Sequence, residues 1–226
     1  MIDKTVRSIA DALADVRDGA TVLVAGFAGV GEPRALVEGL IEQGAKNLTV
    51  VQNAAGRDTG SVGRLVALGR VRKLIVSFVS RAYAKAVQER YADGRLELEM
   101  VPQGTIAERV RAGGAGVPAF YTRTSVGTLL ANGKEARAFA GETYVLEHAI
   151  RGDVALVEAW EADRWGNLTY RASGNNFNGV MAMAADLTVA QSQHIRELGT
   201  LDPERIHTAG IFVSRVVHVP CGDPPE

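Results

Sequence analysis

A glycine-rich segment near the N-terminus has the composition of an anion-binding loop. Gly26, Gly29 and Gly31 follow a short apolar run at 21–25, and Pro33 then opens a helical pattern. Glycines let backbone N–H groups approach a negatively charged group closely, and a helix N-terminus adds positive potential. The spacing is not G-x-G-x-x-G, and no Gly-Lys-Ser/Thr follows, which disfavours a dinucleotide site and excludes a P-loop. An anion or thioester site and a simple tight turn remain as alternatives.

A second candidate is Gln103, which falls between a predicted strand at 96–101 and a predicted helix. A neutral amide at this place can donate a hydrogen bond to an oxyanion that develops during a reaction, without a proton transfer. The alternative is structural: Gly104 or Thr105 starts the helix, and Gln103 only faces water. Residue types alone favour the structural alternative.

A third candidate combines glycines with cations. Gly113, Gly114 and Gly116 follow Arg109 and Arg111 closely in the sequence. Backbone donors and a guanidinium together can wrap a carboxylate. The alternative is that both arginines face solvent on a helix that ends at a glycine.

Composition excludes several classes of function. The chain has 226 residues, with 25 Lys and Arg against 26 Asp and Glu, and a net charge of −1 argues against a nucleic-acid binder. No apolar run reaches the ~20 residues that a membrane-spanning helix needs. The four histidines are scattered without metal-ligand spacing, so no metal site is expected, and no G-x-S-x-G elbow is present.

The expected location is the cytoplasm. Acidic residues stand in the first segment, MIDKTVRSIADAL, where a signal peptide would be basic and then apolar. Cys221 is the only cysteine, so a disulfide framework is excluded and a reducing compartment is expected.

Two of the three candidates, the glycine-rich segment and Gln103, follow predicted strands. Short β-branched and aliphatic runs, typical of strands buried on both faces, alternate with helical patterns. This alternation predicts a parallel sheet wrapped by helices, which binds ligands at its carboxyl edge. The predicted strands are 21–25, 48–51, 74–78 and 96–101, and the predicted helices are 2–16, 34–43, 62–68, 82–91 and 106–111.

The alternation breaks at 113–118, which we interpret as a loop, and shorter strands follow. The predicted fold class is therefore α/β: an open, mostly parallel, Rossmann-like sheet flanked by helices, with short additional strands in the middle of the chain. Since no linker or repeat is evident, we expect one domain over residues 1–226, with an irregular tail after about residue 219. The later predicted strands are 143–146, 154–159, 168–170, 187–190 and 213–219, with a helix closing at 182–185.

Several long motifs, in order, resemble the A subunit of the family I CoA-transferases. The family signature ends in G-G-F-x-x-x-G-x-P, and here Ala25 replaces its first glycine. The resemblance extends from about residue 4 to residue 219, and the segments that carry it are 18–33, 102–105, 107–122 and 163–171.

The resemblance implies a CoA-transferase fold and a reaction through a covalent intermediate. In the family, a glutamate of the B subunit attacks an acyl-CoA thioester and becomes a glutamyl-CoA thioester. That glutamate stands in a Ser-Glu-Asn-Gly motif, which none of the glutamates of this chain matches, Glu142 and Glu158 included. The chain is therefore expected to be half an enzyme, active only in a heterodimer or heterotetramer with the B subunit. Acyl-CoA is its substrate, and no permanently bound cofactor is expected.

The resemblance also assigns roles to individual residues. Gly26 and Phe27 would present backbone N–H groups to the thioester, and the amide of Gln103 would contact the reacting acyl group. Asn53 matches an asparagine of a family Ser-Asn-Asn-Ala-Gly stretch, from which Gln52 and Ala55 depart. The implied substrate-binding residues are Gly26, Phe27, Gly31, Asn53, Gly114, Ala115 and Gly116.

Within the family, the segments 163–171, 198–204 and 210–213 are most similar to members that use 3-oxoadipate. The expected reaction moves CoA from succinyl-CoA to this 3-oxo acid. An acetate- or acetoacetate-type transferase subunit is the first alternative. A non-catalytic binding subunit or a sugar-phosphate isomerase is the second, although no acid/base pair for isomerisation is evident.

Overall fold

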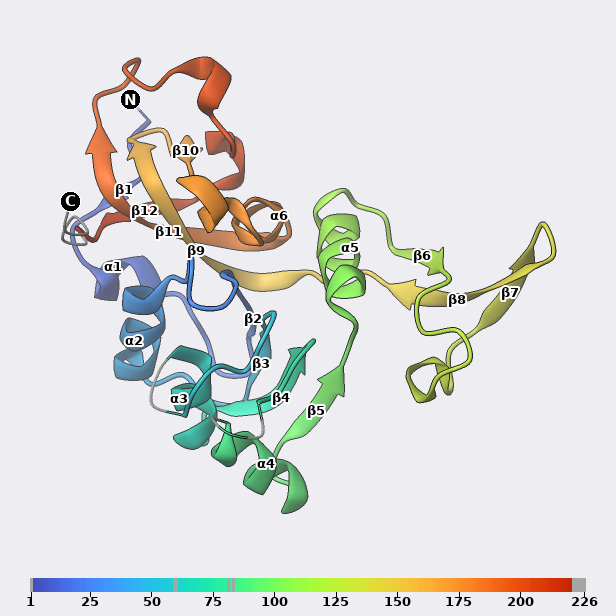
Figure 1. Cartoon of the computed structure of the whole chain (residues 1–226). Helices are drawn as coiled ribbons and strands as arrows, with labels where there is room; N and C mark the ends of the chain where they lie inside the picture. Colours follow the sequence, from blue (N-terminus) through green and yellow to red (C-terminus); the bar gives the residue numbers. More distant parts are fainter. Residues whose placement is uncertain (1, 59–60, 81, 83, 221–226) are drawn as a thin grey trace.

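A mostly parallel sheet crosses the molecule with helices on both faces, which confirms the predicted fold class (Figure 1). The computed structural model describes residues 2–58, 61–80, 82 and 84–220, so Cys221 and nearly all of the predicted irregular tail lie outside it. Within that part, the order is β1-β12-β11-β9-β2-β3-β4-β5, all neighbours being parallel, and β10 pairs antiparallel with β9. The strands are β1 (Thr5–Val6), β2 (Thr21–Val24), β3 (Leu48–Val51), β4 (Val71–Val76), β5 (Glu97–Met100), β9 (Gly152–Asp163), β10 (Leu168–Thr169), β11 (Ala185–Arg196) and β12 (Arg215–His218).

Alternation along the central strands builds a core on each face of the sheet. Val22 and Val24 of β2 pack with the helices α1 to α4, whereas Leu23 and Ala25 pack with α5 and α6. Because both faces are covered, the strands are apolar throughout. The α-helices are α1 (Ile9–Leu13), α2 (Arg34–Gln43), α3 (Ser61–Ala67), α4 (Lys85–Ala92), α5 (Gln103–Gly114) and α6 (Asn178–Met183), and the 3-10 helices are η1 (Leu129–Ala131), η2 (Ala172–Asn175), η3 (Pro203–Arg205) and η4 (Gly210–Phe212).

The sheet reverses its winding direction between β2 and β9. From β2 the chain passes outward through β3, β4 and β5, whereas from β9 it passes the other way through β11 and β12. In parallel sheets, the crevice at such a switch point, outside the carboxyl ends of the strands, is where ligands bind. The loop that follows β2 is the glycine-rich segment 26–31.

A second, antiparallel sheet in the order β6-β8-β7 projects from the body as an arm (Figure 1). Its strands are β6 (Ala119–Thr122), β7 (Ala136–Phe139) and β8 (Glu142–His148). Only β8 is predicted from the sequence, since β7 is exposed along its whole length and has no alternation of buried residues. The buried carboxylate of Glu147, in β8, makes two ion pairs. It pairs with Lys134 within the arm, and it lies 3.9 Å from Arg109 Nε of α5, which links the arm to the body.

Two predicted elements are wrong in their extent. The segment 2–16 is not one helix: Thr5–Val6 is β1, parallel to β12, and α1 starts only after Ser8, whose hydroxyl accepts a hydrogen bond from the Asp11 N–H. The predicted break at 113–118 is also misplaced, since α5 continues through Gly113 and Gly114. A Cβ at Gly113 would lie 2.0 Å from the Ile150 carbonyl oxygen, so this glycine permits close packing rather than a turn.

No helix in the part described is long and apolar enough to cross a membrane.

A side chain from β11 caps the helix that follows the glycine loop. Pro33 cannot cap α2, and the buried Gln191 Oε1 accepts hydrogen bonds from the N–H groups of Ala35 (3.1 Å) and Leu36 (3.2 Å) instead. These N–H groups have no partner inside the helix. The first turn of α2 is thereby fixed to the opposite half of the sheet.

We expect Gln191→Ala to lower the free energy of unfolding by about 1–3 kcal/mol, because one buried and one part-buried N–H group lose their acceptor. Urea unfolding measures this loss. Gln103→Ala is the matched control, since Gln103 is exposed and its removal should change stability by less than about 0.5 kcal/mol. Equal stability of the two variants would contradict the capping role.

Candidate active site

The ends of four neighbouring strands converge on one pocket of about 500 Å³. We call it the Gln103 pocket. Phe27 follows β2, Asn53 follows β3, Ser77 and Phe78 follow β4, and Gln103 follows β5. The structure therefore brings together three of the residues that the sequence singled out: Phe27, Asn53 and Gln103.

The glycine loop is a tight hairpin turn. Phe27 and Val30 exchange two backbone hydrogen bonds of 3.0 and 2.9 Å, and Ala28 and Gly29 between them have φ values of 52° and 85°. Positive φ at both central residues is the signature of a type I′ turn. The Phe27 N–H is thus occupied by the Val30 carbonyl, and it is not a free donor for a thioester. Gly26 directly precedes the turn and packs closely against the backbone of Glu32. A Cβ at this position would lie 2.9 Å from Glu32 Cα.

Asn53 is held in a fixed orientation at the floor of the Gln103 pocket. The Ser77 hydroxyl donates to its side-chain oxygen at 2.9 Å and lies 2.8 Å from its backbone carbonyl. Asn53 is buried, and its amide oxygen lies against the Ser77 hydroxyl. The hydrogen-bond donor that the Asn53 side chain can offer is its NH2 group.

Gln103 is an exposed residue that begins α5. The structural alternative places the helix start at Gly104 or Thr105, but the helix starts one residue earlier and its N-cap is Pro102. Within the described residues, the Gln103 side chain has no hydrogen-bond partner, and it borders the same pocket as Asn53. The Gln103 pocket therefore carries two neutral amides and no carboxylate among its described lining residues.

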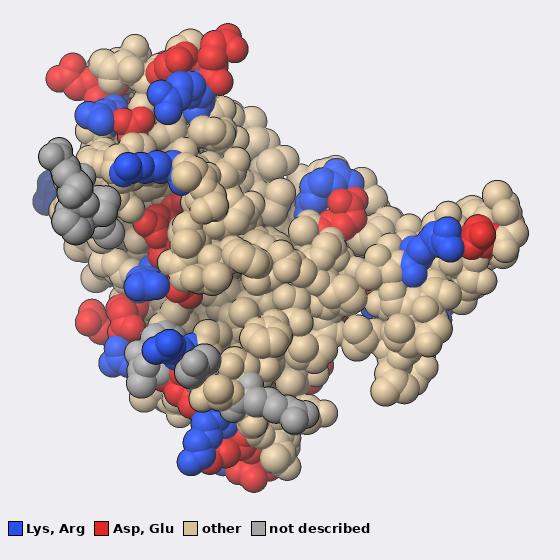
Figure 2. Space-filling view, in the orientation of Figure 1, with Lys and Arg blue, Asp and Glu red and all other residues tan. Residues whose placement is uncertain are grey.

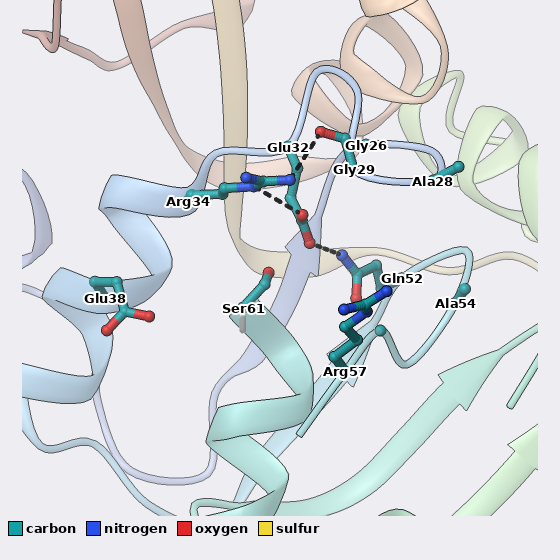
Figure 3. Close-up of a pocket in the computed structure, with 11 residues that line it drawn as sticks. Gly26, Ala28, Gly29, Glu32, Arg34, Glu38, Gln52, Ala54, Arg57 and Ser61 are labelled. Atoms are coloured by element: carbon teal, nitrogen blue, oxygen red, sulfur yellow. Dashed lines mark hydrogen bonds and ion pairs between the residues drawn. The ribbon is translucent and has the colours of Figure 1, made fainter. Parts of the chain in front are cut away.

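A second pocket, of about 630 Å³, adjoins the first, and both are lined by Ala28 and Ala54. We call it the Gln52 pocket (Figure 3). Its polar wall was not predicted from the sequence: Glu32 accepts a hydrogen bond from Gln52 Nε2 at 2.9 Å and pairs with Arg34 Nε at 3.4 Å. Glu38, Arg57 and Ser61 complete that wall. The position of Glu32 and Arg34 directly after the glycine loop is the one sequence signal that points to them.

Gly31 lies on the opposite side of the glycine loop, next to a third pocket of about 380 Å³. Its carbonyl accepts a 2.9 Å hydrogen bond from Asn178 Nδ2, which fastens the loop to α6. Glu158 lines this third pocket and accepts a 2.8 Å hydrogen bond from Gln193. Burial raises the pKa of Glu158, against the opposing effect of that hydrogen bond. Its carboxyl group belongs to this third pocket and is not among the residues that line the Gln103 pocket.

The predicted cluster at Gly114, Ala115 and Gly116 is not brought to these pockets. It lies at the far end of the 12-residue helix α5, roughly 18 Å from Gln103 at the rise of an α-helix. The arginines beside it are paired, Arg109 with Glu99 and Arg111 with Glu108, both at 2.6 Å.

Uncharged surface surrounds the mouth of the Gln103 pocket. Phe27, Val30 and Phe78 are 42%, 46% and 60% exposed. Figure 2 shows a broad region with few charged side chains over the middle of the body, whereas both signs of charge gather along its left edge and over α5. Exposed apolar groups that gather around a pocket are typical of a surface that another molecule covers.

Comparison with known proteins identifies the family. The chain is 48% identical over 219 residues to the A subunit of the 3-oxoadipate CoA-transferase of Acinetobacter baylyi, covering 97% of this chain and 96% of that protein. It is also 48% identical over 214 residues to the A subunit of a probable succinyl-CoA:3-ketoacid coenzyme A transferase of Bacillus subtilis, covering 95% and 89%. An acyl-CoA transferase of E. coli O157:H7, solved as a thioester complex with CoA, has the same fold, with a TM-score of 0.84 at 21% identity. The match covers 96% of this chain and 47% of that one, so this chain spans about half of its length. Residues 6–219 match the sequence profile of the Coenzyme A transferase family, and the chain therefore belongs to the family I CoA-transferases as an A subunit.

Proposed function

We propose that this chain works with a B subunit to move CoA from succinyl-CoA to a 3-oxo acid, with 3-oxoadipate as the acceptor. The names of the relatives support the reaction class and the need for a second subunit. This chain matches about half of a longer acyl-CoA transferase chain, which is in keeping with a separate B subunit that supplies the other half of the enzyme. The exposed Phe27, Val30 and Phe78 give that half an apolar surface to cover.

The observation that carries this proposal is the Gln103 pocket, which offers hydrogen-bond donors but no carboxylate among its described lining residues. The amides of Asn53 and Gln103 border it, while the Ser77 hydroxyl is engaged by Asn53. Such donors stabilise an oxyanion, but they cannot attack a thioester. The attacking carboxylate must then come from the partner.

The reaction follows from this division of roles. A glutamate oxygen of the B subunit attacks the succinyl thioester carbonyl, the oxyanion accepts hydrogen bonds from the amides, and the C–S bond breaks to give an anhydride and CoA thiolate. The thiolate attacks the glutamyl carbonyl of the anhydride, so that succinate leaves and a glutamyl-CoA thioester remains. The acceptor acid repeats these steps in reverse.

The acceptor is tested with the reconstituted pair and a panel of acids. We expect 3-oxoadipate to exceed acetoacetate by at least about tenfold in kcat/KM, because a site that pairs with a second carboxylate is left unmatched by a monocarboxylic acid. Arg109 and Arg111 are engaged by Glu99 and Glu108, so the group that pairs with this carboxylate is expected on the B subunit.

The second candidate is the 3-ketoacid-type transferase, which the Bacillus subtilis relative favours at the same 48% identity. Equal or reversed preference in the panel would select it. That outcome would leave the partner subunit and the covalent mechanism unchanged. Absence of CoA transfer to every acid would contradict the proposed function itself.

A further inference from the structure

Two buried polar atoms in the Gln52 pocket have no hydrogen-bond partner within the described part of the chain. They are Gln52 Oε1 and Ser61 Oγ, on residues that are only 4% and 8% exposed. Both residues line the pocket, and Figure 3 shows the Ser61 hydroxyl directed into the space between α2 and Gln52. A buried polar atom without a partner costs free energy, so a ligand that supplies partners to both atoms would be favoured in this pocket.

The orientation of the Gln52 amide defines which partner is missing. Its Nε2 donates to Glu32 Oε1 at 2.9 Å, while the second carboxylate oxygen of Glu32 pairs with Arg34. Turning the amide over would place its oxygen against the Glu32 carboxylate oxygen. Gln52 therefore offers an acceptor to the pocket, and the ligand must bring an N–H or O–H group. The Ser61 hydroxyl can supply the complementary donor.

The substrates of the proposed function, on which this inference rests, differ in what they can supply here. The carboxylates of succinate and of a 3-oxo acid only accept hydrogen bonds, so they cannot donate to the Gln52 oxygen, even though Arg34 and Arg57 also line this pocket. The pantetheine arm of CoA contains two secondary amides, each with an N–H and a carbonyl. Because the Gln52 pocket adjoins the Gln103 pocket through Ala28 and Ala54, an arm attached to the reacting sulfur can enter it.

We propose that the Gln52 pocket binds an amide of the pantetheine arm of CoA. The amide N–H donates to Gln52 Oε1, and the amide carbonyl accepts from the Ser61 hydroxyl. The departure of Gln52 from the asparagine expected in the family then has a consequence: the longer side chain reaches Glu32 and still lines the pocket.

The test compares thioesters that differ only in whether one amide NH of the pantetheine arm is replaced by oxygen. The complex with the B subunit is assayed with succinyl-CoA, with succinyl-pantetheine, and with two succinyl-pantetheine analogues in which one or the other amide NH is replaced by oxygen. We expect one of the two ester analogues to be poorer than succinyl-pantetheine by about tenfold in kcat/KM, because an oxygen then faces the Gln52 oxygen. Gln52→Leu should abolish that preference.

Two serine variants distinguish an effect on substrate binding from an effect on folding. Ser61→Ala removes no hydrogen bond within the described residues, and it should lower kcat/KM for succinyl-CoA about tenfold without a change in Tm. Ser125→Ala is the matched control, since Ser125 also has an unpartnered buried hydroxyl and a positive φ but lies outside the pocket. Its kinetics should match the wild type.

The outcomes distinguish this inference from the function on which it rests. Normal turnover of succinyl-CoA with equal reactivity of the amide and both esters would overturn the pantetheine assignment alone. Retention of the amide preference by Gln52→Leu, or unchanged kinetics of Ser61→Ala, would also overturn it. Absence of CoA transfer from every thioester would overturn the proposed function as well.

Discussion

The purified chain, without its partner, is expected to transfer no CoA from succinyl-CoA to 3-oxoadipate or any other acid. The Gln103 pocket presents the amides of Asn53 and Gln103 but no carboxylate among its described lining residues. Glu158 lines the third pocket, and Glu32 is engaged by Gln52 and Arg34. Without the nucleophile, the rate should lie at least about 10⁴-fold below that of the reconstituted pair.

The measurement is the formation of the new acyl-CoA, followed first with this chain alone and then during titration with the B subunit. Activity should rise as the partner is added and level off at a fixed ratio of the two chains. Substantial turnover by the chain alone, with contamination by the partner excluded by mass spectrometry, would contradict the division of roles and place the nucleophile on this chain.

Gln103→Ala is expected to lower kcat of the reconstituted pair about 10²-fold, the usual effect of removing one oxyanion donor. Gln103 is exposed and its side chain has no partner among the described residues, so the melting temperature should hardly change. Turnover and thermal unfolding of the same preparation are measured together.

Gln88→Ala is a suitable control for this variant, because Gln88 is an exposed glutamine on α4 and does not line the Gln103 pocket. Its kcat should equal that of the wild type. A modest loss of stability in Gln103→Ala with nearly normal turnover would show instead that Gln103 supports only the start of α5.

The central strands were predictable because a strand that is buried on both faces is a continuous apolar run in the sequence. β2 and β3 are uninterrupted β-branched and aliphatic runs, and they occur where the sequence places them. β7 is not such a run, because all four of its residues are exposed. β1 is a two-residue strand whose partner, β12, lies some 200 residues later, so only the folded chain defines it.

The same distinction applies to the site. Gln103 was predictable because it follows a predicted strand, and the carboxyl ends of parallel strands meet at one edge of the sheet. Asn53 was expected only from the resemblance to the family. Gly113 and Gly114 misled the sequence interpretation, since they serve contacts with Ile150 and Met183 rather than a loop. The hydrogen bond between Gln52 and Glu32 depends on how two loops face one another, and no local pattern encodes that.

Because Gln191 caps α2, this helix cannot reach its final structure on the ribosome until residue 191 has been synthesised. Gln191 follows Ala35 by 156 residues, so at typical synthesis rates α2 remains uncapped for between about 8 and 30 seconds. During the same interval, β2 has no β9 beside it and is an apolar edge that other nascent chains can join. The glycine loop between β2 and α2 is therefore expected to become rigid only near the end of translation, and slow synthesis of the last third of the chain would favour aggregation.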